Sequence, residues 1–260
     1  MVKELILEDI FRDLEIKKQV KVGDKVINVP VKYKTQSIMG FFPISTKKAV
    51  EFINNKRLKP VEFSWGKSLI GITLFNHIEC PVGPYKEIAF SIPIIRDTKI
   101  SIPFINILFN NKLKNFGFYS FMLTGSTDIG REHAEKIWGY PFYNKIIDVF
   151  LEETESSFNI LAEAKEKQEK VFSMVVMKTK KNKVTKKDYQ TYFFKNEKLI
   201  KVELNTIGIS GYSLKKDSGK LELGNHEISN ILGSLEINLI PLETLYYREA
   251  IKIANIPEEV

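Results

Sequence analysis

Short apolar segments of strand character, separated by polar turns, constrain the fold of this chain more than any other feature. They occupy residues 26–33, 69–75, 88–94, 116–124, 172–177, 190–194, 199–204 and 208–214. The regular alternation of strand and helix that indicates a parallel sheet does not occur. We therefore predict an α+β fold built on a mostly antiparallel sheet or barrel.

Helical spacing of apolar residues is confined to a few places. It occurs over residues 3–18 and predicts a peripheral N-terminal helix within residues 1–20. A second helix should begin at Ser45 or Thr46 and bury three apolar side chains, Ala49, Val50 and Ile53. Asp128 should cap a third helix, which runs to about Trp138 and ends at Gly139-Tyr140-Pro141 because the residue before a proline disfavours helix.

Length and composition favour one folded unit. The chain has 260 residues, of which 43% are hydrophobic, and no low-complexity linker divides it. We therefore predict a single domain over residues 1–260. The single cysteine, Cys80, excludes an internal disulfide, and acidic residues interrupt the apolar N-terminal segment. These features predict a soluble, cytoplasmic protein without a signal peptide or a membrane partner.

Lysine supplies most of the net charge of +7. One cluster in residues 178–187 contains six lysines, namely Lys178, Lys180, Lys181, Lys183, Lys186 and Lys187. It lies between two predicted strands and contains no aromatic residue. We interpret it as an exposed hairpin tip rather than a nucleic-acid site. One hypothesis nevertheless remains a non-catalytic binding module in which this hairpin contacts an anionic partner.

The sequence lacks the motifs of several common enzyme classes. There is no glycine-rich phosphate loop, no paired-cysteine metal motif and no Gly-x-Ser-x-Gly nucleophile motif. The three histidines, His77, His133 and His226, do not have the spacing of metal ligands. We therefore predict neither a metal nor a cofactor.

Three ordered segments resemble the acetoacetate decarboxylase superfamily. Residues 82–93, Val-Gly-Pro-Tyr-Lys-Glu-Ile-Ala-Phe-Ser-Ile-Pro, match a segment in which a Gly, a Tyr and a Glu precede an apolar strand. Ile137-Trp138-Gly139-Tyr140-Pro141 resembles the turn before the catalytic lysine. Residues 219–226 resemble a late strand and turn, followed by an apolar strand over residues 237–247. The order and spacing agree over residues 26–250.

The resemblance implies a cone-shaped, mostly antiparallel β-barrel with packed helices, an internal reaction pocket and a homo-oligomeric assembly. In this family a lysine amine attacks the keto group of acetoacetate, and the resulting Schiff base accepts electrons while carbon dioxide leaves. The amine must be neutral to attack, so an apolar pocket and a neighbouring cation lower its pKa.

This chain departs from the family at the nucleophile. The family has two adjacent lysines directly after the Gly-Tyr-Pro turn, whereas this chain has Phe142 and Tyr143, neither of which can form an imine. Gly130-Arg131-Glu132 lies four residues farther from the turn than in the family, which is about one helical turn. The family's substrate-facing arginine and second buried glutamate have no clear counterpart.

The resemblance also gives the candidate site residues. Glu87 should point into the pocket with a raised pKa and move a proton. Lys145, in preference to Lys136, could provide a relocated amine. The expected substrate-binding wall consists of Tyr85, Trp138, Tyr140, Phe142 and Tyr143. Phe90, Ile92, Phe142 and the 237–247 strand should enclose one central cavity.

Two hypotheses place the function in this pocket. In the first, the pocket binds a small keto acid or related carbonyl compound without the usual Schiff base, and acts through Glu87 by enolisation or hydration or by binding alone. In the second, the protein is a decarboxylase or aldolase-type lyase that uses Lys145 or Lys136. Both predict a small-molecule partner and no nucleic acid.

Overall fold

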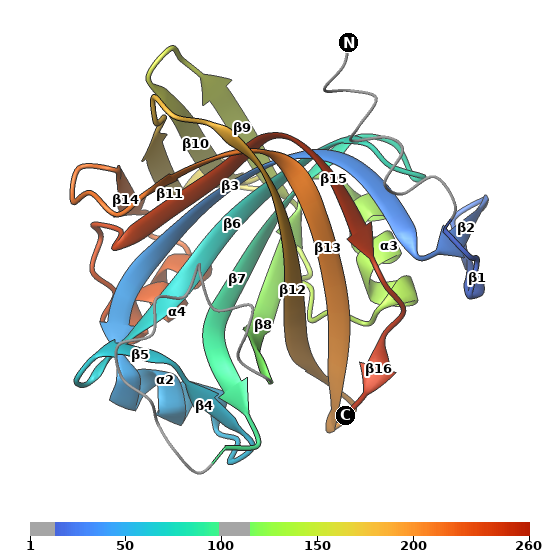
Figure 1. Ribbon diagram of the computed structural model, residues 1–260, viewed down its shortest axis with the longest axis horizontal. Helices are drawn as coiled ribbons and strands as arrows, with labels where there is room; N and C mark the ends of the chain where they lie inside the picture. Colours follow the sequence, from blue (N-terminus) through green and yellow to red (C-terminus); the bar gives the residue numbers. More distant parts are fainter. Residues whose placement is uncertain (1–13, 99–114) are drawn as a thin grey trace.

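Seven strands form a closed barrel in the computed structural model, which describes residues 14–98 and 115–260 (Figure 1). Around the barrel the order is β7, β8, β12, β13, β15, β3 and β6, and β6 pairs again with β7. The strands are β3 Val31–Ser45, β6 Lys67–Glu79, β7 Tyr85–Arg96, β8 Phe116–Gly125, β12 Lys183–Lys195, β13 Lys198–Ser213 and β15 Glu243–Ala254. Every neighbouring pair is antiparallel except β8–β12, which confirms the predicted mostly antiparallel α+β barrel.

The parallel contact between β8 and β12 depends on a glycine. Thr191 lies opposite Phe118 and Tyr192 opposite Tyr119 in this short ladder. A Cβ atom at Gly117 would lie 2.5 Å from the Gln190 carbonyl oxygen. A larger residue at this position would push the two strands apart, because glycine marks sites where backbones approach closely.

A second sheet covers part of the outer barrel surface (Figure 1). Its order is β14, β11, β10, β9, with bounds β9 Ile147–Glu153, β10 Ser157–Ala164, β11 Glu169–Met177 and β14 Gly219–Leu223. The largest hydrophobic cluster joins this sheet to the barrel wall; in it the Phe90 ring meets the Phe172 ring edge-on at 6.1 Å. Strand alternation sends Phe90 and Ile92 into this outer core, so the prediction that they enclose the central cavity was wrong.

Three helices occur in the described part of the chain, α2 Thr46–Ile53, α3 Asp128–Ile137 and α4 Glu227–Ser234. Ser45 caps α2 as predicted, but Val50 on that helix is exposed rather than buried. The Thr127 hydroxyl, not Asp128, caps α3. Gly139 follows α3 with φ of +83°, a conformation that favours glycine after a helix. None of these helices is long and apolar enough to span a membrane.

The smaller elements correct two predictions. Residues 18–20, expected in the N-terminal helix, belong to a hairpin of β1 Lys18–Val22 and β2 Lys25–Val29, while residues 1–13 lie outside the described residues. The closing strand is β15 and begins at Glu243, six residues later than position 237. Three short strands extend the barrel sheet, namely β4 Leu58–Pro60, β5 Glu62–Ser64 and β16 Glu258–Glu259.

The lysine cluster is not a hairpin tip. It connects β11 in the second sheet to β12 in the barrel, and residues 183–187 already belong to β12. Lys178 is nearly buried, and its Nζ atom lies 2.7 Å from Glu153 Oε1 and 4.8 Å from the centre of the Phe158 ring. The sequence could not distinguish a hairpin from a crossing between sheets, because both place polar residues between two strands.

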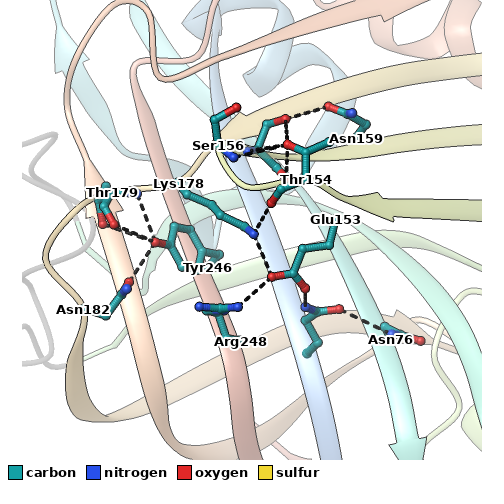
Figure 2. A network of polar contacts seen from close by, with 12 residues as sticks. Asn76, Glu153, Thr154, Ser156, Asn159, Lys178, Thr179, Asn182, Tyr246 and Arg248 are labelled. Atoms are coloured by element: carbon teal, nitrogen blue, oxygen red, sulfur yellow. Dashed lines mark hydrogen bonds and ion pairs between the residues drawn. The ribbon is translucent and has the colours of Figure 1, made fainter.

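Glu153, at the end of β9, joins the second sheet to the barrel (Figure 2). Besides Lys178, its carboxylate accepts hydrogen bonds from Arg248 on β15 at 3.0 Å and from Gln36 on β3 at 3.1 Å. These interactions lower the Glu153 pKa although burial opposes them. The network fixes the position of one sheet on the other.

Candidate functional site

The barrel encloses a cavity of about 90 Å³ to which all seven barrel strands contribute side chains. Aromatic rings form much of its wall. One group consists of Tyr33, Phe75, Tyr85, Trp138 and Tyr140, and another of Phe41, Phe118 and Tyr189. A water molecule needs roughly 10–15 Å³ of such space, so the cavity has room for roughly six to nine waters. This space suits a small organic molecule.

A lysine on the last barrel strand, Lys252, lines this cavity and is 6% exposed. Its Nζ atom lies over two rings, 3.9 Å from the centre of Phe75 and 4.6 Å from the centre of Tyr33. Burial lowers the pKa of the amine to about 8, while the negative charge of Glu87 acts in the opposite direction. At pH 7 to 7.5 roughly a tenth to a quarter of such amines are neutral, compared with about 0.1% or less of ordinary lysines. Lys252 therefore has the properties of a nucleophilic amine.

Glu87 lies in the same cavity, on β7, and is 6% exposed. Burial raises its pKa, and the nearby Lys252 charge and hydrogen bonding with Tyr85 offset part of that rise. The structure thus agrees with the predicted inward orientation and raised pKa of Glu87. A carboxyl group with a raised pKa and an amine with a lowered pKa in the same cavity can both take part in proton transfer near neutral pH.

Two tyrosines and two histidines surround this pair on one side. The His77 ring lies 4.5 Å from that of Tyr33 and 4.8 Å from that of Tyr85, and His133 on α3 contacts both tyrosines. Burial and the Lys252 charge lower the pKa of His77 strongly and that of His133 to about 4. Both histidines are therefore neutral at pH 7 and add no positive charge to the site.

Trp138 and Tyr140 connect the Gly-Tyr-Pro turn to the barrel. The indole Nε1 of Trp138 donates to the Asn255 carbonyl oxygen at 2.7 Å, just beyond the end of β15. The Tyr140 hydroxyl lies 2.6 Å from Thr191 Oγ1 on β12. These two bonds hold the aromatic rings against the cavity, and burial raises the Tyr140 pKa well above its ordinary value.

Comparison with known proteins identifies the architecture. No protein-family model and no curated protein sequence matches the chain. A solved acetoacetate decarboxylase superposes with a TM-score of 0.60 at 13% identity, covering 89% of each chain. The acetoacetate decarboxylase from Legionella pneumophila gives 0.59 at 12% identity and covers 98% of this chain and 95% of that one. The chain has the acetoacetate decarboxylase fold. The enduracididine biosynthesis enzyme MppR, in complex with pyruvate, also resembles it, with a TM-score of 0.58, 10% identity and coverage of 88% and 90%.

The acetoacetate decarboxylase fold brings only some of the predicted residues together. Glu87, Tyr85, Trp138 and Tyr140 line the cavity. Phe142 does not, because it forms a bridge with Leu123 on β8 and its ring packs over Gly125.

Tyr143 lies outside the cavity as well. Its hydroxyl donates to the Glu227 carboxylate and lies 3.3 Å from His226. Of the wall residues predicted around the Gly-Tyr-Pro turn, Tyr140 is therefore the last one in the chain that lines the cavity.

Neither predicted lysine reaches the cavity. The Lys136 side chain is 52% exposed and pairs with Glu132 on α3. Lys145 is exposed and lies in a surface groove with Glu166 and Glu227. The pattern Ala250-Ile251-Lys252-Ile253-Ala254, a lone lysine in an apolar strand, was the sequence signal for the buried amine. It falls beyond the segments that carry the resemblance, so the resemblance did not predict it.

Proposed function

We propose that the barrel cavity binds a small keto acid or related carbonyl compound and that Lys252 forms a Schiff base with it. The observation that carries the proposal is a buried amine with a pKa of about 8 inside a cavity that also contains Glu87. The proposal retains the predicted relocated amine but places it at Lys252 rather than at Lys145 or Lys136. An enzyme of this kind would be a lyase or a related carbonyl-chemistry enzyme.

The covalent step needs no co-reactant. The neutral Nζ atom attacks the carbonyl carbon and forms a carbon–nitrogen bond, and the carbonyl oxygen leaves as water. One proton of that water comes from the attacking amine, and the other is the proton that the ammonium group had given up to the Glu87 carboxylate, so the product is a protonated imine and Glu87 is again a carboxylate. The Glu87 carboxylate can then take a proton from the adjacent carbon, and the electron pair of that bond forms an enamine.

The likeness to MppR, which was solved in complex with pyruvate, supports a small carbonyl ligand. The aromatic wall supports the same step, because excluding water raises the fraction of neutral amine. The alternative of an anionic partner for the lysine cluster receives less support, since Lys178 is already paired with Glu153.

Reductive trapping tests the proposal. The protein is incubated with pyruvate, acetoacetate or 2-butanone in the presence of cyanoborohydride, and adducts are located by intact mass and peptide mapping. We expect one adduct on Lys252 of the unmodified protein. Lys252→Met should abolish it, while Lys136→Met, which removes an exposed lysine, should leave it unchanged. An adduct spread over surface lysines, or one that persists in Lys252→Met, would contradict the proposal.

Glu87→Gln tests the second step. Deuterium exchange at the carbon beside the carbonyl of 2-butanone, followed by NMR in D₂O, should fall at least tenfold in this variant while the imine can still be trapped. Equal exchange in both proteins would exclude Glu87 as the base.

A further inference from the structure

The charges inside the cavity limit the kind of carbonyl compound that it accepts. Among the described residues that line it, Lys252 is the single cation and Glu87 the single anion. The remaining lining residues are uncharged, and the two adjacent histidines are neutral because their pKa values are lowered. The described wall therefore offers no second cation that could pair with a substrate carboxylate.

Imine formation keeps this charge balance only for a neutral substrate. Before reaction, the ammonium form of Lys252 and the Glu87 carboxylate sum to zero. After a neutral ketone or aldehyde reacts, the protonated imine and Glu87 again sum to zero. A keto acid adds one negative charge to a cavity lined mostly by uncharged side chains, where an unpaired charge is expensive.

The wall also suits neutral polar groups. Besides the tyrosines, six serine and threonine side chains line the cavity, namely Ser37, Thr73, Ser91, Ser120, Thr191 and Thr206. A hydroxyl group can donate to or accept from a neutral oxygen function, but it does not neutralise a carboxylate. Together with the volume of about 90 Å³, this composition fits a small molecule with uncharged oxygen atoms.

We propose that the preferred ligand is a small neutral ketone or aldehyde rather than an anionic keto acid. This inference rests on the proposed Schiff base at Lys252 and narrows the class of its substrate. It assigns to Glu87 a second effect, the exclusion of a like charge, in addition to proton transfer.

Two probes of the same shape test the inference. In 4-oxopentanoate a carboxylate occupies the position that an isopropyl group occupies in 5-methyl-2-hexanone. Each is titrated against the unmodified protein with cyanoborohydride, and the concentration for half-maximal adduct on Lys252 is compared after correction for its reaction with butylamine. We expect this concentration to be at least tenfold lower for the neutral ketone.

The Glu87→Gln variant separates the contribution of charge to the ketone preference from the contribution of hydrophobicity. Removing the carboxylate should reduce the preference for the neutral ketone at least threefold, because the apolar wall is unchanged while the like charge is lost. An unchanged preference in this variant would overturn the charge argument.

Two further outcomes separate the inference from the proposed function. If 4-oxopentanoate labels Lys252 as readily as the ketone does, the inference is wrong and the Schiff base stands. If neither probe labels Lys252, the Schiff base itself is wrong and the inference falls with it.

Discussion

The amine of Lys252 on β15 lies 3.9 Å from the centre of the Phe75 ring on β6, across the intervening strand β3. The ring attracts the protonated amine through its negatively polarised face, yet it also contributes to the dry surroundings that favour the neutral form. The balance of these two effects determines how much neutral amine is present at a given pH.

The first prediction concerns the titration of Lys252. With a pKa of about 8, its reactivity towards trace acetic anhydride should rise roughly tenfold per pH unit below pH 7 and level off near pH 9. A lysine with an unperturbed pKa should continue to gain reactivity up to about pH 10.5. Quantitative peptide mapping over pH 6 to 10 follows Lys252, and a reactivity that still rises at pH 10 would contradict the lowered pKa.

Phe75→Leu should lower the Lys252 pKa further. Leucine keeps the site apolar but removes the aromatic face, whose attraction for a buried ammonium group is about 0.5–2 kcal/mol. That loss corresponds to roughly 0.4–1.5 pKa units, since one unit is about 1.36 kcal/mol. The same acetic anhydride titration detects it, and an upward shift would mean that water penetration outweighs the lost ring contact.

Lys252 and Glu87 should be strongly coupled in stability. Lys252→Met or Glu87→Gln alone leaves a buried charge without its partner and should cost roughly 3–5 kcal/mol. The double variant contains neither charge and should match the unmodified protein or exceed it by roughly 1–4 kcal/mol. Urea unfolding at pH 7 gives all four free energies, and simple additivity of the two losses would argue against coupling.

An amine placed at position 142 should not replace Lys252. The Phe142 side chain packs over Gly125 outside the cavity, so the lysine of Phe142→Lys should stay solvated with an ordinary pKa. In a Lys252→Met background, trapping with 2-butanone should therefore remain absent. A specific adduct on the introduced lysine would show that position 142 does reach the cavity.

Glu243, at the start of β15, should destabilise the fold at alkaline pH. It is 3% exposed, and burial raises its pKa to about 7. Because the folded state binds the proton more tightly than the unfolded state, stability decreases as pH rises from about 4.5 to 7, and the penalty is complete above pH 7. Glu243→Gln should therefore increase the free energy of unfolding by roughly 1–3 kcal/mol at pH 8 and by little at pH 4.5. A gain of equal size at both pH values would exclude titration as its cause.

Strand alternation in the sequence was sufficient to predict a mostly antiparallel sheet or barrel, and the family resemblance predicted the internal pocket and four residues that line it. Strand alternation and the motif around Tyr85 and Glu87 each involve residues that are close together in the chain, so a single sequence is enough to recognise them. The turn at Gly139 likewise places Trp138 and Tyr140 beside the barrel. The helix at residues 227–234 and the strands at 147–153 and 157–164 were missed, because their polar residues obscure the apolar spacing.

The reactive amine could not be predicted in the same way. Lys252 faces the cavity because a register shift in the pairing of β15 with β3, between Tyr247 and Ala250, sets the inward face of the rest of the strand. A shift of one residue would have turned Lys252 outward. Such irregularities depend on pairing partners more than 200 residues away, which a local pattern does not contain.

The place of β15 between β13 and β3 also matters while the chain is being made. A ribosome produces β3 and β13 before β15, so until residues 243–254 have emerged these two strands each lack their β15 partner. Exposed strand edges are sites of intermolecular pairing, and nascent chains stalled before this point should be prone to aggregation. The strand that carries Lys252 is therefore also the one that closes the barrel. Because burial lowers the pKa of the Lys252 amine, that lowered pKa arises only when the barrel is complete.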